Sequence, residues 1–343
     1  MKKLLILSFI FFLLILIIPK KEKSPNIFLI TLDGVRWQEV FYGIDKDLVD
    51  NTNYVENKSL LIDRYYSPQL FERREKLMPF TWNYIYKNGK LFGDSLNNSK
   101  FSLTNNMIFS YPGYNEILTG NADPTIKSNA KIYNKNVTVL EKLNQTNNYK
   151  NKIAAFASWD VFPYIINDKR SGIPVNAGYM EELNIKTPVV DYINKNQKRT
   201  PVIWENVRLD VYTHNLALEY IKKKKPKLVY IAYGETDDFA HGEKYDFYIN
   251  SLNYTDNMIA ELWGYVQSNK FYKDNTYFII TTDHGRGLME DWSGHGTSQA
   301  SWLAILGPNI EKTGLVEGEF FTNQIAETIM QISKKSKTKI PTD

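Results

Sequence analysis

Apolar runs separated by polar segments dominate the chain after residue 25. Short, often β-branched apolar runs, which are typical of buried strands, cover 26–31, 152–158, 227–233, 277–282 and 301–306. Longer amphipathic stretches, which predict helices, cover 210–223, 245–268 and 324–333. Strands that alternate with helices predict an α/β fold, and 343 residues are enough for one large domain or two smaller ones.

The amino terminus has the character of a targeting segment. Lys2 and Lys3 precede an apolar run over 4–18, and a lysine-rich segment closes the run at residue 23. A basic start before such a run is typical of an export signal. No small-x-small cleavage site follows, so an uncleaved membrane anchor is as well supported as a removed signal peptide, although the run is short for a span of about 20 residues. We therefore expect an exported, extracytoplasmic or periplasmic protein, held at the membrane if residues 1–23 are retained.

Charge argues against a nucleic-acid duplex as partner. The formal net charge is +4, but residues 1–23 contain five lysines and one glutamate, so the exported part is close to neutral. A general basic field for gripping phosphate backbones is therefore missing from that part. The lysines over 222–227 suit a helix end, and the lysine-rich tail over 336–343 is expected to be solvated.

Cysteine is absent from the chain, which excludes disulfides, thiolate metal ligands and a cysteine nucleophile. Any metal site must therefore use oxygen and imidazole ligands. The four histidines carry unusual weight for this reason; they are His214, His241, His284 and His295. His214 lies within a predicted helix, and we interpret it as a packing or helix-surface residue.

Three predicted strands end in side chains that can carry chemistry. These side chains are Asp33 after 26–31, Asp237 with His241 after 227–233, and Asp283 with His284 after 277–282. Open α/β folds bind ligands at the carboxyl edge of the sheet, where such strand ends meet. Each motif alone also has an ordinary interpretation, because aspartate often caps a turn and Asp-His-Gly is a common way to leave a sheet.

Taken together, these residues favour a metal site. Asp237 and His241 are four residues apart, so on a helical turn they share a face and can hold one cation. His295 follows in a glycine-flanked loop. Three carboxylates and three imidazoles suit two divalent metals a few ångströms apart, with coordination positions left open for a substrate.

Ser110 is the candidate nucleophile. It lies just before Pro112, which favours the first turn of a helix, and Gly120 marks the end of that helix. A helix amino terminus favours anions such as phosphate. From sequence position alone, a plain N-cap is the commoner use of a serine at such a place.

In their order along the chain, these motifs resemble the alkaline phosphatase superfamily, and most closely its type I phosphodiesterase/nucleotide pyrophosphatase group. The shared pattern is LDG near the start, a serine or threonine before x-Pro that opens a helix ending in TG, then D-x-x-x-H, DHG and a late GHG. The pattern spans residues 26–297. An ordered match of five parts is far more specific than any one part.

The resemblance implies a three-layer α/β/α fold with a largely parallel central sheet. It also implies two divalent metal ions, commonly zinc in the family, with Mn²⁺ or Mg²⁺ as alternatives. One ion would be held by Asp237, His241 and His295, and the other by Asp33, Asp283 and His284. Ser110 would bridge towards the second ion and attack phosphorus to form a phosphoseryl intermediate.

The chain departs from the family pattern at two places. Family phosphodiesterases usually carry asparagine three residues after the nucleophile, where this chain has Gly113, so we predict that Asn115 binds the substrate instead, with a helix first-turn residue as the alternative. Sulfatases of the superfamily use [C/S]-x-P-x-R, and this chain has Tyr114 at the arginine position. Hydrolysis of sulfate esters is therefore disfavoured.

The sequence thus predicts a metal-dependent hydrolase of phosphate esters, either a phosphodiesterase or a phosphomonoesterase. We assign residues 24–335 to this metallohydrolase domain and consider 121–226 a candidate insertion that lines the substrate site. Two alternatives stay open: a phospho-group transferase or mutase that uses the same site, and a tethered binding domain with a relict site. The expected partners are a phosphate-ester substrate and, through residues 1–23 if uncleaved, a membrane.

Overall fold

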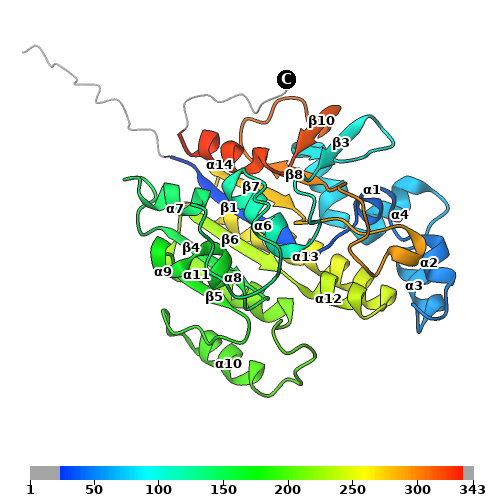
Figure 1. Ribbon diagram of the computed structural model, residues 1–343, viewed down its shortest axis with the longest axis horizontal. Helices are drawn as coiled ribbons and strands as arrows, with labels where there is room; N and C mark the ends of the chain where they lie inside the picture. Colours follow the sequence, from blue (N-terminus) through cyan, green and yellow to red (C-terminus); the bar gives the residue numbers. More distant parts are fainter. Residues whose placement is uncertain (1–23, 335–343) are drawn as a thin grey trace, which may run out of the picture.

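Helices cover both faces of a central sheet in the computed structural model, which describes residues 24–334 (Figure 1). The predicted leader over 1–23 and the lysine-rich tail lie outside the described residues. Within 24–334, no helix combines the length and the apolar character that a membrane crossing requires.

The sheet has eight strands in the order β5-β4-β6-β1-β7-β8-β2-β9. Their bounds are β1 (Asn26–Leu32), β2 (Lys90–Phe92), β4 (Ile153–Ala157), β5 (Val175–Ala177), β6 (Leu228–Tyr233), β7 (Thr276–Thr281), β8 (Leu303–Leu306) and β9 (Gly314–Leu315). All neighbouring pairs are parallel except β7 with β8 and β8 with β2. Strands β10 (Gly318–Phe321) and β3 (Ser99–Ser102) form a separate parallel pair. The predicted three-layer fold with a largely parallel sheet is confirmed.

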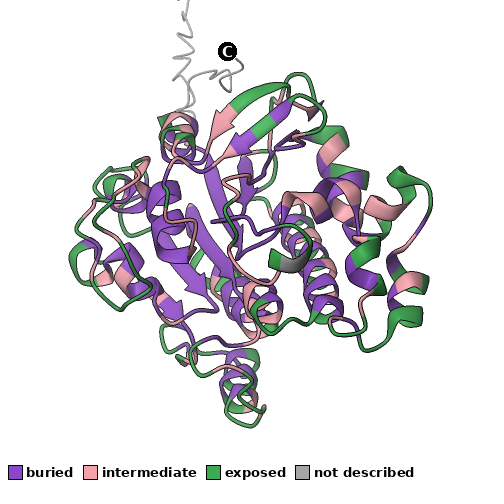
Figure 2. Cartoon of the chain, turned by 45° about the vertical axis from the view of Figure 1, so that its right-hand side comes forward, coloured by how far each residue is buried: buried purple, intermediate pink, exposed green. Residues whose placement is uncertain are grey.

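Strand β1 shows why both faces are covered. All seven of its residues are buried, and its side chains alternate between the two hydrophobic cores. Phe28 and Ile30 point into one core, and Ile27 and Leu29 point into the other. A strand that is apolar on both faces needs cover on both, which is why this sequence reads as a continuous apolar run. Figure 2 shows the central strands as buried throughout.

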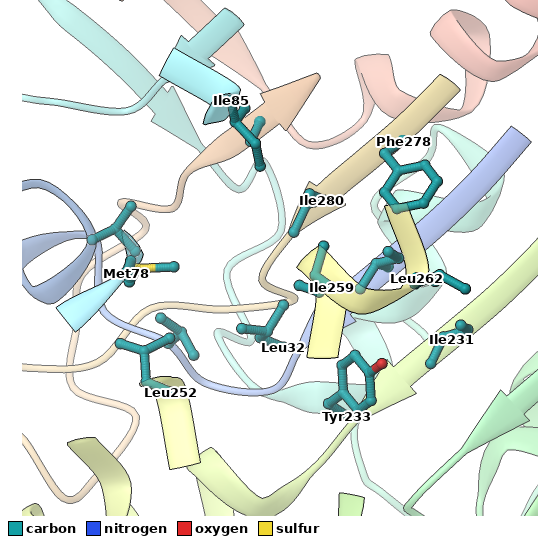
Figure 3. Close-up of a cluster of buried hydrophobic side chains, with 14 of the residues drawn as sticks. Leu32, Met78, Ile85, Ile231, Tyr233, Leu252, Ile259, Leu262, Phe278 and Ile280 are labelled. Carbon is teal, nitrogen blue, oxygen red and sulfur yellow. The ribbon is translucent and has the colours of Figure 1, made fainter. Parts of the chain in front are cut away.

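The larger core lies under helices that mostly follow β1 and β6 in sequence. These are α1 (Trp37–Tyr42), α2 (Lys46–Asp50), α3 (Lys58–Tyr65), α4 (Leu70–Leu77), α5 (Tyr86–Asn88), α10 (Pro188–Gln197), α11 (Asp210–Lys224), α12 (Glu235–His241) and α13 (Tyr245–Ser268), with a π-helical turn over Thr81–Ile85. Figure 3 shows Leu252, Ile259 and Leu262 of α13 beside strand residues such as Ile280. The predicted helix over 245–268 is confirmed at both ends.

The second core lies under α6 (Ser110–Thr119), α7 (Val139–Asn144), α8 (Phe162–Ile166) and α14 (Gln324–Lys334), with α9 (Asp168–Ser171) beside them. A 3₁₀ turn, η2 (Met289–Asp291), lies in the loop after β7. Helix α6 is buried along nearly its whole length, because it packs between the sheet and α14.

Residues 121–226, the candidate insertion, are in large part integral to the sheet and its cover. This range supplies β4 and β5 to the main sheet and α11 to its cover, so much of it belongs to the core of the fold. The long connection between β5 and α11 carries α10, whose Val190 and Ile193 belong to the larger core. That residues within 121–226 line a substrate site stays a prediction.

Candidate metal and nucleophile site

The three strand ends singled out in the sequence meet at one edge of the sheet. Strand β1 lies between β6 and β7, with Leu32 paired to Tyr233 and Thr31 paired to Thr281. Because the three strands are parallel and in register, the residues that follow them leave the sheet side by side. Asp33 follows β1, α12 follows β6, and Asp283 with His284 follows β7.

Asp237, His241 and His295 form one group of possible metal ligands, with candidate atoms all within 4.8 Å of one another. Asp237 and His241 lie on α12, where Nε2 of His241 is 3.3 Å from Oδ2 of Asp237. The side chain of His241 is 41% exposed, so this group faces solvent. The predicted shared helical face of Asp237 and His241 is present.

Asp33, Asp283 and His284 form the second group, also within 4.8 Å, and all three are buried. Nε2 of His284 is 3.3 Å from Oδ1 of Asp33 and 3.5 Å from Oδ2 of Asp283. It is also 3.6 Å from Oδ1 of Asp237 in the first group. The rings of His284 and His295 are 4.7 Å apart between centroids, so the two groups are contiguous.

Ser110 is the first residue of α6 and is buried beside the second group. Its Oγ lies 3.5 Å from Nε2 of His284. The N-cap position of α6 is occupied by Phe109, which makes no side-chain cap. Ser110 is therefore the first helical residue and not the N-cap. All seven residues predicted for the metals and the nucleophile are therefore brought together.

The protonation state of His284 suggests that a positive charge belongs between the groups. Its Nδ1 lies 2.9 Å from the carbonyl oxygen of Gly285, which can only accept, so Nδ1 carries the proton. A neutral His284 then turns the lone pair of Nε2 towards carboxylate oxygens of Asp33, Asp283 and Asp237. A lone pair that faces carboxylate oxygens needs a proton or a cation between them.

Three buried ligand atoms also lack any hydrogen-bond partner in the described structure: Oδ1 of Asp33, Oδ2 of Asp283 and Nε2 of His295. The other oxygen of each carboxylate is held, because Tyr114 donates to Oδ2 of Asp33 at 2.8 Å and the amide of Gly34 donates to Oδ1 of Asp283 at 3.1 Å. Each aspartate is thus oriented by one oxygen and presents the other. Two divalent cations held by oxygen and nitrogen fit this donor set.

The charges in the site are strongly coupled. Burial favours a neutral Asp237, but the guanidinium of Arg286 outweighs it and keeps the pKa of Asp237 well below its usual range. Burial, followed by the charge of Asp33, raises the pKa of Asp283. Burial and then His284 lower the pKa of His295 to about 3, so this imidazole is neutral and able to act as a ligand.

Sequence reasoning missed Arg286, which is 1% exposed and joins three ligand-bearing segments. Its guanidinium donates to the carbonyl of Gly34 at 3.0 Å, to the carboxylate of Asp237, and to the carbonyl of Ser293 at 2.6 Å. Gly34 has a φ of +60°, and a Cβ there would lie 2.9 Å from two guanidinium nitrogens. The only signal for Arg286 in the sequence was its position two residues after His284.

Asn115, the predicted substrate contact, has its side chain held by other parts of the chain. The side chain is fully buried, its Nδ2 donates to the carbonyl of Asn121 at 2.8 Å, and its Oδ1 accepts from Asn134 and Asn136, both at 3.1 Å. All of its polar atoms are engaged in a network that holds the loop after α6. The structure therefore gives Asn115 a structural contact, and its contact with a substrate stays a prediction.

Gly113, the other departure, has a packing reason. A Cβ at Gly113 would lie 2.2 Å from the carbonyl oxygen of Asp283. Helix α6 thus passes too close to the end of β7 for any side chain at this position, and asparagine would not fit there. The close approach brings Ser110 to the second ligand group.

His214 is buried and packs as predicted, although Asp210 precedes it with the same spacing as Asp237 and His241. Nδ1 of His214 lies 2.8 Å from the hydroxyl of Tyr233, whereas Asp210 accepts from Ser158 and from the amide of Gly234. The spacing alone therefore did not distinguish a ligand pair from a structural one.

Comparison with known proteins gives one family match. The model of the Sulfatase family matches residues 176–326. This range includes five of the six candidate ligands, all except Asp33. No curated protein matches the chain.

Solved structures share the fold at low identity. The lipoteichoic acid synthase LtaP from Listeria monocytogenes is 12% identical, with a TM-score of 0.59 over 93% of this chain and 74% of that one. A protein of the alkaline phosphatase superfamily from Vibrio parahaemolyticus is 12% identical, with a TM-score of 0.53 over 91% and 67%. A 2-O GAG sulfatase is 12% identical, with a TM-score of 0.52 over 92% and 71%.

These structures show the fold and leave the ester class open. The Sulfatase match supports an enzyme, whereas the solved structures show the shared fold. The narrower likeness to the type I phosphodiesterase/nucleotide pyrophosphatase group stays a prediction. The fold and the Sulfatase match together confirm the expected resemblance of this chain to the alkaline phosphatase superfamily.

Proposed function

We propose that this protein is a metal-dependent hydrolase of phosphate esters, with Ser110 as nucleophile. The observation that carries the proposal is the contact between the nucleophile and the second ligand group, with Oγ of Ser110 3.5 Å from Nε2 of His284. Two divalent cations, with zinc as the first choice, would supply positive charge that favours the serine alkoxide and stabilises the oxygens of the reacting ester.

The chain's own residues define the rest of the reaction. The hydroxyl of Ser110 gives its proton to solvent and its Oγ attacks phosphorus. The bond from phosphorus to the leaving oxygen breaks, and the departing alkoxide takes a proton from solvent. Water then cleaves the phosphoseryl bond and releases phosphate or a phosphomonoester. Solvent exposure of His241 indicates that the substrate enters on the side of the first ligand group.

Phosphate is favoured over sulfate by Tyr114. The sulfatase pattern needs an arginine at this position, and here the Tyr114 hydroxyl donates instead to Oδ2 of Asp33. The side chain is fully buried and oriented towards a candidate ligand, so it cannot replace a guanidinium. Ser110 is therefore expected to act as an unmodified serine.

The test is a comparison of p-nitrophenyl phosphate, bis-p-nitrophenyl phosphate and p-nitrophenyl sulfate, with metal content measured on the same purified protein. We expect turnover of at least one phosphate ester, loss of turnover with a chelator, and about two equivalents of divalent metal. Turnover of the sulfate alone would reverse the assignment of ester class. Absence of both turnover and metal would favour a tethered binding domain.

A phospho-group transferase remains the second candidate, since the phosphoseryl bond can also be cleaved by an alcohol. The observation that favours it is the shared fold of a lipoteichoic acid synthase, because the name of that protein describes a synthetic reaction and not a hydrolysis. Glycerol or a sugar acceptor added to the same assay separates the two. A transferase would form the phosphorylated acceptor in preference to free phosphate. We also propose that the protein is exported and acts outside the cytoplasm.

A further inference from the structure

Glu116 lies on the same helix as the nucleophile, and its side chain is fully buried. Its carboxylate accepts five hydrogen bonds. The donors are the amide (2.8 Å) and hydroxyl (3.0 Å) of Thr104, the amide (2.9 Å) and side-chain nitrogen (2.7 Å) of Asn105, and the hydroxyl of Thr322. Four of the five donors belong to the loop that leads into α6. A buried carboxylate satisfied to this degree fixes the segment that surrounds it.

The same loop contains a strained residue. Ile108 has a φ of +53°, in the left-handed region that β-branched residues rarely occupy. Oδ1 of Asn105 accepts from the amides of Met107 and Ile108, both at 3.1 Å, and Asn105 is in turn held by Glu116. Such a conformation persists only where surrounding contacts over-determine it.

The strained residue lies two positions before Ser110. Phe109 continues from it in an extended conformation, and the helix begins at the next residue. The ring of Phe109 lies 6.3 Å from that of His295, and Gln299 donates to the carbonyl of Asn105 at 3.2 Å. The direction of the chain at Ile108 therefore sets where the hydroxyl of Ser110 lies relative to the ligand groups.

We propose that Glu116 is a positioning residue, which holds the loop over 104–109 in its strained form so that Ser110 faces His284. This proposal rests on the proposed role of Ser110, but its structural part can be tested without any reaction. Glu116 touches no candidate ligand and acts only through the loop.

Glu116→Gln is the first variant. In the glutamine, an amide nitrogen replaces one carboxylate oxygen and would face either the two nitrogen donors of Asn105 or the amide of Thr104. A donor that faces a donor cannot form a hydrogen bond, so the contacts to one of these two loop residues must break. The matched control is Glu141→Gln, which changes another buried glutamate, on α7, that pairs with Arg170. Both variants lose a buried charge, but only the first borders the loop.

The readouts are amide exchange of the peptide over 103–109, measured by mass spectrometry, and the kcat and KM of phosphate-ester turnover, measured on the full chain. We expect Glu116→Gln to speed exchange at Met107 and Ile108 and to lower kcat by about 100-fold, with KM and metal content unchanged. Glu141→Gln should leave the exchange of this peptide and kcat unchanged.

A second variant separates positioning from general damage. Glycine occupies positive φ without strain, so adding Ile108→Gly to Glu116→Gln should slow the exchange again and recover at least tenfold in kcat. Unchanged exchange in Glu116→Gln, or faster exchange with an unchanged kcat, would overturn the proposal. A wild-type protein that turns over none of the esters would instead overturn the proposed function, while the exchange data would still decide whether Glu116 holds the loop.

Discussion

Arg286 donates to Asp237 across the gap between the loop after β7 and α12, through both the carboxylate and the backbone carbonyl of that aspartate. The same guanidinium reaches Gly34 beside Asp33 and Ser293 near His295. One buried side chain therefore connects three of the segments that carry candidate ligands. A contact beyond the ligands themselves often decides how well a metal site is formed.

Replacing Arg286 should therefore weaken one ligand group more than the other. Arg286→Lys keeps a charge but loses the planar fork that reaches three carbonyls at once. We expect metal affinity at Asp237, His241 and His295 to fall about 10- to 100-fold, with the second metal retained. Each protein is titrated with a chelator, and its metal content is then measured. At a chelator concentration where the wild type keeps two equivalents of metal, the variant should keep one. Equal loss of both metals would contradict this assignment.

Ser110→Ala should remove turnover without removing metal. The hydroxyl is the attacking group in the proposed reaction, whereas six other side chains form the ligand groups. We expect a fall in kcat of about a thousandfold or more. Metal content and the unfolding temperature should stay close to those of the wild type. If the variant kept nearly the wild-type rate, Ser110 would not be the nucleophile.

Most of the candidate ligands could be predicted because they come soon after an apolar run. A buried parallel strand is visible in the sequence as a continuous apolar segment, and its carboxyl end falls at the edge where ligands bind. Asp33 and Asp283 could be placed in this way before any coordinates. The order of the motifs then connected Ser110 and His295, which local patterns alone could not bring together.

Residues that act through tertiary contacts could not be predicted in the same way. Arg286 and Tyr114 contact the ligands from segments far away in sequence, and neither has a spacing that indicates this role. Asn115 lies one helical turn beyond Ser110, and only the structure shows that it faces the loop after α6. Likewise, β5 is only three residues long, too short to show as an apolar run, whereas the neighbouring β4 was predicted over 152–158.

Gly113→Ala should destabilise the protein and disturb the second ligand group. The added Cβ would lie 2.2 Å from the carbonyl oxygen of Asp283, so either α6 or the end of β7 must move. We expect a loss of about 1–3 kcal/mol in the free energy of unfolding, together with weaker metal binding.

Gly264→Ala is the control, because nothing lies within 4 Å of its added Cβ. Within the carboxyl-terminal part of α13, that change should be neutral or stabilising, by at most about 1 kcal/mol. Equal effects of the two changes would contradict the close approach.

Asn115→Ala should lower stability and leave substrate affinity unchanged. It removes the partners of Asn121, Asn134 and Asn136, and leaves buried polar groups unsatisfied at an expected cost of about 1–3 kcal/mol. Chemical denaturation measures the first effect and KM for a phosphate ester measures the second. Asn257→Ala, on the exposed side of α13, provides a control with little expected effect on either. A large rise in KM with normal stability would restore Asn115 as a substrate contact.

The stability of the metal-free protein should fall as pH rises from about 6.5 to about 9. Burial disfavours a charged His284, but the charge of Asp283 and the adjacent carboxylate of Asp33 outweigh it and raise the pKa of His284 to about 9. A pKa that is higher in the folded protein than in the unfolded chain stabilises fully below the unfolded value of about 6.5, and this stabilisation is lost as pH passes the folded value. For this buried imidazole the effect is about 3 kcal/mol.

A bound cation would replace that proton, so metal and proton should compete for the same place. The difference in unfolding temperature between metal-loaded and chelator-treated protein should therefore increase over this pH range. Thermal unfolding at pH 6 and pH 9, with and without added zinc, measures it. His284→Gln removes the titrating group and should flatten the pH dependence of the metal-free protein. A constant difference in the wild type would mean that His284 carries no proton where the cation is proposed to bind.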